Sequence, residues 1–108
     1  MKRISTKRAK ALQIPMKVKK AVYERDNGLC VVCGRPGNPE AHYVPRSRGG
    51  LGVEQNVITL CRECHDKFDF GDRETMTYYD QLIRNYLMGQ YPSWREEDLI
   101  YRKYGGKL

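Results

Sequence analysis

Two short cysteine-bearing stretches decide the fold, CVVC at residues 30–33 and CRECHDKFD at residues 61–69. They contain all four cysteines of the chain in two C-x-x-C pairs, Cys30 with Cys33 and Cys61 with Cys64. Two such pairs supply the four thiolates of a closed tetrahedral metal site. Two disulfides are the alternative, but paired C-x-x-C in a chain without secretory features favours a metal. Zinc is the expected ion, and the sequence leaves iron open.

The segment between the pairs has the pattern of a hairpin followed by a helix. Residues 40–44 and 57–60 are short and β-prone, which predicts two antiparallel strands joined by a long loop. A helix from Arg62 to about Phe70 follows the second strand. A metal ion held by both C-x-x-C pairs would join the two ends of this hairpin, so its binding should be coupled to folding. Four thiolates leave no open coordination position, which indicates a structural site.

The two histidines of the chain, His42 and His65, both lie in this region, with Asn56 between them. Together with the cysteine pairs, their spacing over roughly residues 17–70 resembles the HNH endonucleases. The resemblance implies an α+β fold, a small ββα-metal finger with a four-cysteine zinc knuckle, flanked by an N-terminal helix and C-terminal helices. It also implies that the protein hydrolyses DNA phosphodiester bonds. By resemblance, His42 is the general base that takes a proton from the attacking water.

The resemblance further implies one catalytic divalent ion, held by His65 and Asp69. These residues are four apart on the expected helix and therefore share one face. Many members of the family have histidine at the position of Asp69, and a carboxylate favours Mg²⁺ or Mn²⁺, with other divalent ions left open. Asn56 either tethers the loop by hydrogen bonds, the favoured interpretation, or ligates the ion. Ala41 departs from the family, which has a metal ligand there, so water, substrate or another residue would complete the ion's ligands.

The net charge of +7 is concentrated at the N-terminus. Residues 1–20 carry eight Lys or Arg and no acid, whereas the rest of the chain has twelve basic and thirteen acidic residues. We predict a basic flexible arm over residues 1–13, which serves either as a contact to DNA phosphates or as a solvated leader. Lys17, Lys19 and Lys20, on a helix expected over residues 15–26, extend this basic surface, and Lys17 and Lys20 are the candidates for DNA contacts. Arg46 and Arg48 in the loop between the strands are further candidates for phosphate contacts.

The length of 108 residues predicts one domain, which we expect over residues 14–108. Its core motif spans residues 28–71, and a helical extension spans residues 73–104. In that extension an apolar stripe predicts a helix over residues 73–88 that ends at Gly89. Ser93 and Glu96 resemble a capping box for a last helix over residues 94–104. No apolar run could span a bilayer and the charged N-terminus lacks a secretory signal, so we expect a soluble cytoplasmic protein that binds DNA and no membrane.

The leading hypothesis is a metal-dependent HNH endonuclease acting on DNA. The alternative is a non-catalytic zinc-containing module that binds DNA or a protein, with Ala41 marking a decayed metal site. An RNA-directed protein is a third interpretation, which no aromatic RNA-recognition motif supports. The resemblance implies a phage or bacterial origin, hence a bacterial host cell, with partners in phage packaging or other DNA processing. Cleavage specificity, nicking against double-strand cutting and oligomeric state stay open.

Overall fold

An antiparallel pair of strands forms the centre of the fold, β1 (Asn38–His42) and β2 (Val57–Leu60). In their register Ala41 lies opposite Ile58, and His42 lies opposite Val57. All four residues of β2 are buried, whereas β1 buries Ala41 and leaves His42 half-buried. The computed structural model describes residues 7–102 of the chain. The hairpin thus turns one side of β1 into the core and presents His42 on the other side.

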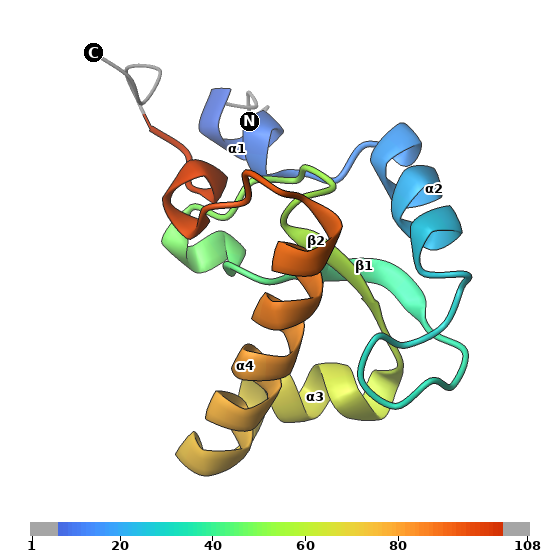
Figure 1. The fold of residues 1–108 in the computed structure, drawn as a ribbon. Helices are drawn as coiled ribbons and strands as arrows, with labels where there is room; N and C mark the ends of the chain where they lie inside the picture. Colours follow the sequence, from blue (N-terminus) through green and yellow to red (C-terminus); the bar gives the residue numbers. More distant parts are fainter. Residues whose placement is uncertain (1–6, 103–108) are drawn as a thin grey trace, which may run out of the picture.

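Helices surround this hairpin (Figure 1). α2 (Met16–Arg25) packs against both strands, α3 (Arg62–Phe70) follows β2 directly, and α4 (Arg73–Gln90) packs against α3. The remaining elements are the short helix α1 and two 3-10 helices: α1 (Lys7–Leu12), η1 (Arg46–Arg48) and η2 (Glu96–Leu99). Within residues 7–102, no helix combines the length and the apolar composition needed to cross a bilayer.

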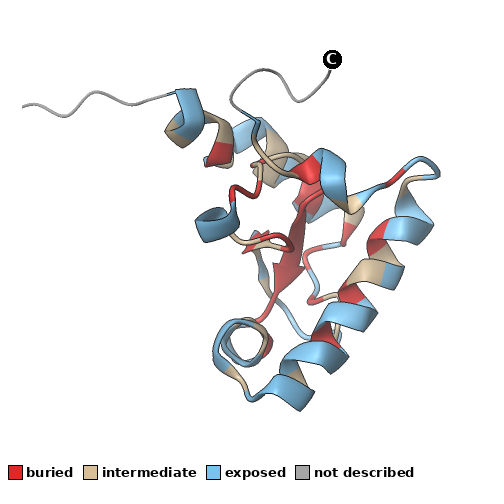
Figure 2. Cartoon of the chain, turned by 90° about the vertical axis from the view of Figure 1, so that its left-hand side faces the viewer, coloured by how far each residue is buried: buried red, intermediate tan, exposed pale blue. Residues whose placement is uncertain are grey.

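The core lies between the hairpin and the inward face of α4. Tyr79, Ile83 and Leu87 follow one another at intervals of four, so they lie on one face of α4, and all three are buried in one cluster with Ile58 and Leu60 of β2. Figure 2 shows buried residues concentrated on the strands and along one side of α4. The stripe of apolar residues in this helix is therefore packing surface, as the sequence predicts.

The predicted fold class is confirmed: helices stand at both ends of a two-stranded antiparallel sheet, with a cysteine cluster beside it. The expected helix over residues 15–26 appears as α2, and the expected strand 57–60 and helix 62–70 have the predicted bounds. The first strand occupies residues 38–42 instead of 40–44. It ends earlier because the Val44 amide bonds to the side chain of Asn56 and not to a strand.

Three expectations need correction. Residues 7–12, assigned to a flexible arm, form α1 and bury Leu12; residues 1–6 lie outside the described residues. α4 continues through Gly89 to Gln90, where the Tyr91 amide still bonds to the Leu87 carbonyl. The helix expected over residues 94–104 is only the 3-10 turn η2. Its N-cap is Arg95, and no side chain caps it. Residues 103 and 104 lie outside the described part.

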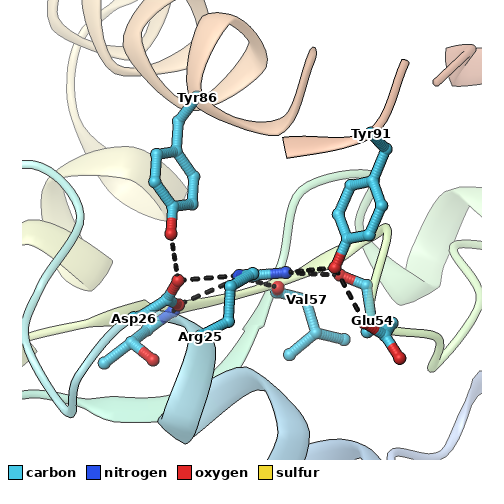
Figure 3. A network of polar contacts seen from close by, with 7 residues as sticks. Arg25, Asp26, Glu54, Val57, Tyr86 and Tyr91 are labelled. Carbon is cyan, nitrogen blue, oxygen red and sulfur yellow. Dashed lines mark hydrogen bonds and ion pairs between the residues drawn. The ribbon is translucent and has the colours of Figure 1, made fainter. Parts of the chain in front are cut away.

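A buried polar network joins α2, β2 and the end of α4 (Figure 3). The Arg25 guanidinium donates to both carboxylate oxygens of Asp26, at 2.7 and 3.0 Å, and to the carbonyl oxygen of Val57 at 2.8 Å. The hydroxyl of Tyr86 donates to Asp26, and the guanidinium also donates to the hydroxyl of Tyr91 at 3.1 Å. Desolvation, together with the Asp26 carboxylate, raises the pKa of Tyr86 to about 12, so its hydroxyl keeps its proton.

Removing the cation of this network should destabilise the fold strongly. The Asp26 side chain has no solvent exposure, so Arg25→Ala leaves a buried carboxylate without its counter-charge. Breaking a buried ion pair in this way costs about 3–5 kcal/mol of the free energy of unfolding. Urea unfolding measures this, with Arg95→Ala as control, because Arg95 pairs with Glu97 and Asp98 on the surface. Equal midpoints for the two variants would contradict the structural role of Arg25.

Candidate active site and metal centre

The four cysteine sulfurs form the metal centre. Each lies within 4.8 Å of the others, and all four are free thiols. A zinc ion with Zn–S bonds of about 2.3 Å holds its sulfurs roughly 3.8 Å apart in a tetrahedron, so the cluster matches the size of a zinc site. Cys33 and Cys61, which come from different pairs, have sulfurs 3.6 Å apart. The residues present therefore fit a single zinc ion and not two disulfides.

A backbone amide points at one sulfur in each of the two C-x-x-C pairs. The Cys33 amide points at the Cys30 sulfur at 3.5 Å, and the Cys64 amide points at the Cys61 sulfur at 3.4 Å. The second of these contacts caps the N-terminus of α3. The first pair lies in a turn entered through Gly28, whose φ of +68° places it in the left-handed region. The C-x-x-C spacing thus places the backbone amide of the second cysteine against the sulfur of the first cysteine in both pairs.

Arg35 is a supporting residue of the metal centre that sequence reasoning missed. Its guanidinium donates to the Cys33 sulfur at 3.4 Å and to the Glu63 carboxylate at 2.6 Å. The hydrogen bond from Arg35 is the main cause that lowers the pKa of Cys33 to about 6. Such a residue favours the thiolate that a metal requires. The available signal was a basic residue two positions after one cysteine pair and an acidic residue within the other.

His42 lies at the end of β1 with its ring orientation fixed. Its Nε2 atom is 2.9 Å from the carbonyl oxygen of Leu12. A carbonyl oxygen can only accept, so we assign the ring proton to Nε2, which leaves the lone pair of Nδ1 available. Desolvation by burial lowers the pKa of His42, and the positive charge of Arg46 lowers it further. The imidazole is therefore neutral near pH 7 and can accept a proton at Nδ1.

His65 and Asp69 form a pair on α3 close to His42. The His65 Nε2 and Asp69 Oδ2 atoms are 3.1 Å apart, and both side chains are partly exposed. Both charges act on His42: Asp69 raises its pKa and His65 lowers it, although burial outweighs them. Within residues 7–102, only the four cysteines form a group of three or more His, Cys, Asp or Glu side chains close enough to hold an ion. The helix pair thus offers two ligands, with water and substrate left to supply the others.

Asn56 has the hydrogen bonds of a tether. Its Oδ1 atom accepts the Val44 amide at 2.8 Å, and its Nδ2 atom donates to the carbonyl oxygens of Val44 at 3.1 Å and Leu51 at 2.8 Å. The side chain is completely buried. These bonds hold the two ends of the loop between the strands together, just beyond His42. The alternative role as a metal ligand has no support in this geometry, because the amide oxygen is turned to the backbone.

Comparison with known proteins agrees with this arrangement. The family model described as HNH endonuclease matches residues 30–68. The chain is also 34% identical over 58 residues to "Anaredoxin" from Nostoc sp. (strain PCC 7120 / SAG 25.82 / UTEX 2576), covering 52% of this chain and 76% of that protein. The chain belongs to the HNH endonuclease family. The name of this relative does not describe a nuclease.

Ala41 does not face the site of this HNH domain. It is 1% exposed and packs in the core with residues of α4, on the opposite side of β1 from His42. Glu40 does not take the missing position either: it is exposed and borders a hollow with His42, Gln13 and Lys19, away from Asp69. An acid at position 41 would therefore enter the core rather than complete an ion site.

Ala41→Asp should consequently destabilise the HNH domain and should not improve its ion binding. Burying a carboxylate without a partner costs at least about 2 kcal/mol of the free energy of unfolding. Asn38→Asp is the matched control, because Asn38 is an exposed residue of the same strand. Thermal melting of both variants measures the effect. A melting temperature of Ala41→Asp equal to that of the control would show that this side of β1 can open toward the site.

The predicted phosphate contacts of the HNH domain divide into two groups. Arg46 borders the same hollow as His42, together with Lys19. Arg48 lies in η1 at the other side of His42, 3.7 Å from Glu96. Lys17 and Lys20 are exposed on α2 but border neither hollow that contains His42. Lys19, which the sequence does not distinguish from its neighbours, is the lysine of α2 that lies beside the general-base candidate.

Residues 11–13 also belong to the site of the HNH domain. Leu12 is buried and supplies the carbonyl oxygen to His42, and the Gly52 amide bonds to the Ala11 carbonyl oxygen at 3.0 Å. A Cβ atom at Gly52 would lie 1.8 Å from the Gln13 carbonyl oxygen, so only glycine allows this approach. Deleting residues 1–13 would therefore remove part of the site, contrary to the expectation of a flexible arm. Two features of the sequence could have indicated that residues 11–13 pack against the site: the apolar Leu12 and the glycine-rich loop between the strands.

Proposed function

We propose that this protein is a metal-dependent endonuclease that hydrolyses DNA phosphodiester bonds, with His42 as general base. The observation that carries the proposal is the hydrogen bond from Nε2 of His42 to the Leu12 carbonyl oxygen, which leaves the lone pair of Nδ1 available on a ring that borders the same hollow as Asp69. A neutral, oriented imidazole with a lowered pKa is suited to accept a proton near pH 7.

In the proposed reaction, Nδ1 of His42 takes one proton from a water molecule as its oxygen attacks the phosphorus atom. The new P–O bond forms as the bond to the leaving 3′-oxygen breaks, and solvent returns a proton to that oxygen. His65 and Asp69 would hold a divalent ion, Mg²⁺ or Mn²⁺, which supplies charge neutralisation at the phosphate and the leaving oxygen. Their imidazole and carboxylate donors, 3.1 Å apart and partly exposed, fit such an ion.

Other residues of the chain hold this arrangement in place. Asn56 fixes the loop that follows β1, and the zinc centre joins the hairpin to α3, so His42 and the helix pair keep their relative positions. Arg46 and Lys19 add positive charge beside His42, where a phosphate backbone would pass. The zinc ion has a structural role in this proposal, because its four thiolates leave no open position.

Plasmid cleavage across a titration of Mg²⁺ or Mn²⁺ tests the proposal. The wild type should nick or cut supercoiled DNA only with added ion. His65→Ala and Asp69→Ala should shift the activating ion concentration upward by at least roughly tenfold, because a ligand is lost. Asp66→Ala is the matched control: Asp66 also pairs four residues away on α3, with Arg62, but on the exposed surface.

The alternative function, a zinc-containing binding module, is favoured by one observation, the absence of a ligand at Ala41. It makes the opposite prediction in the same titration. A folded, zinc-loaded wild type that cleaves no DNA at any concentration of either ion would establish the binding module in place of the nuclease. Gel-shift measurements on the same preparation would then show whether DNA is its ligand.

A further inference from the structure

The site continues into a hollow that the proposed reaction does not use. A cavity of about 750 Å³ begins at His42 and Asp69 and runs along the junction of α3 and α4. This volume lies within the range of pockets that hold small molecules of nucleotide size. Phe70 and Met76 form its apolar side, and Arg48 and Arg73 are its basic residues. A nucleic acid bound with a phosphate at His42 would have its adjacent nucleotide at this hollow.

Phe70 is the most exposed large apolar residue at this hollow. It is 82% exposed, ends α3, and directly follows the candidate ligand Asp69. Among the described residues it has no aromatic partner, whereas the neighbouring Phe68 stacks on Tyr43 with ring centroids 6.3 Å apart. An exposed apolar residue alone carries no functional meaning. The position of the Phe70 ring gives it a functional meaning, because the ring borders a cavity that is also lined by the general-base candidate His42.

The charges around the hollow suit one nucleotide. Among the described residues the side chain of Arg73 has no hydrogen-bond or ion-pair partner, so its guanidinium is available for a phosphate. Asp80 borders the same hollow and would repel a second phosphate, but it can accept a hydrogen bond from the amino group of a base. A basic residue, an exposed ring and an acceptor therefore match a phosphate followed by an uncharged, flat base.

We propose that this hollow takes an unpaired nucleobase next to the scissile phosphate, stacked on Phe70, so that the enzyme prefers single-stranded or locally unpaired DNA. The inference rests on the proposed nuclease function and specifies its substrate. A paired base is enclosed in the duplex and must leave the stack to reach a side chain, which costs free energy. A base that is already unpaired avoids this cost, and an aromatic ring then binds it with little dependence on sequence.

Cleavage kinetics on three DNA substrates of equal length test this preference: a single strand, a perfect duplex, and a duplex with one bulged nucleotide. The wild type should have a higher kcat/KM on the single strand and the bulge than on the duplex. Phe70→Ala should raise KM on the unpaired substrates by roughly five- to 100-fold, the usual effect of losing one stacked base. Phe70→Trp should retain the preference. Tyr78→Ala is the control, because Tyr78 is an exposed ring of α4 away from the hollow.

Binding without cleavage gives an independent readout. In the His42→Ala background, a single strand that carries the fluorescent base 2-aminopurine should lose fluorescence when this base stacks in the hollow. Phe70→Ala should abolish this quenching and Phe70→Trp should keep it. Unchanged quenching, or an equal loss of affinity for single strand and duplex, would overturn the inference while the nuclease function stands. A wild type that cleaves no DNA but shows Phe70-dependent quenching would instead overturn the nuclease and support the base site.

Discussion

His42→Ala should lower the rate of DNA cleavage by about 10²–10⁴-fold, the usual effect of losing a general base. The imidazole is neutral because burial lowers its pKa, and its Nε2 atom is held by the Leu12 carbonyl oxygen. The variant removes the proton acceptor but leaves the helix pair and the zinc centre intact. Single-turnover cleavage at saturating Mg²⁺ or Mn²⁺ measures the loss, and zinc content and circular dichroism check the fold.

The pH dependence of the wild type should report the same residue. Because the pKa of His42 is lowered below 6.5, the base is protonated only in more acidic solution. Activity should therefore be retained at neutral pH and fall only in more acidic solution than an ordinary histidine would require, and the residual activity of His42→Ala should lack this acid limb. Asn38→Ala, an exposed change on the same strand, is the control. A wild-type rate in His42→Ala would contradict the mechanism.

Removal of zinc should unfold the domain, which is the largest effect on stability that we expect. The four thiolates join the turn that carries Cys30 and Cys33, the end of the hairpin and the start of α3. Structural zinc sites contribute about 10–16 kcal/mol at neutral pH, which is comparable with the whole stability of a domain, about 5–15 kcal/mol. Cys61→Ser should have the same consequence, because it loses a ligand and alters the cap of α3.

Thermal melting with and without a chelator, together with elemental analysis, measures this dependence. The untreated protein should contain one zinc ion per chain and unfold cooperatively, and the chelated protein should regain its transition when zinc is returned. Arg35→Ala is a graded comparison, because Arg35 touches the sulfurs without being a ligand, and should weaken zinc affinity by roughly 10–100-fold. A chelated protein that melts as the zinc-loaded one does would exclude a structural ion.

Local patterns in the sequence predict the parts of the fold that depend on neighbours along the chain. The bounds of β2 follow from an apolar run. The helix α3 begins directly after Cys61, which is its N-cap. The metal centre follows from the spacing within each C-x-x-C pair. The spacing of His42, Asn56 and His65 likewise indicates where candidate site residues lie. In each case the relevant contacts are made within a few residues or by a motif of fixed geometry.

Contacts between distant segments could not be predicted in this way. The Leu12 carbonyl oxygen meets His42 thirty residues later, and Arg25 meets Tyr91 sixty-six residues later. The failed helix over residues 94–104 has the same origin. There the Leu99 carbonyl oxygen and the Tyr101 amide bond to Leu51 and Gly49 of the loop between the strands. These tertiary hydrogen bonds replace those of a helix, which overrides the local preference.

The polar network around Arg25 also protects the outer edge of β2. A two-stranded sheet leaves one side of each strand without a ladder partner, and such an edge can pair with another chain. Here the guanidinium of Arg25 occupies the Val57 carbonyl oxygen, the Asp26 carboxylate occupies the Thr59 amide, and the Val31 amide occupies the Thr59 carbonyl oxygen. The backbone groups at this edge are thus bonded to two side chains and to the turn that carries Cys30 and Cys33. A chain that loses Arg25 should therefore aggregate by strand pairing as well as unfold more easily.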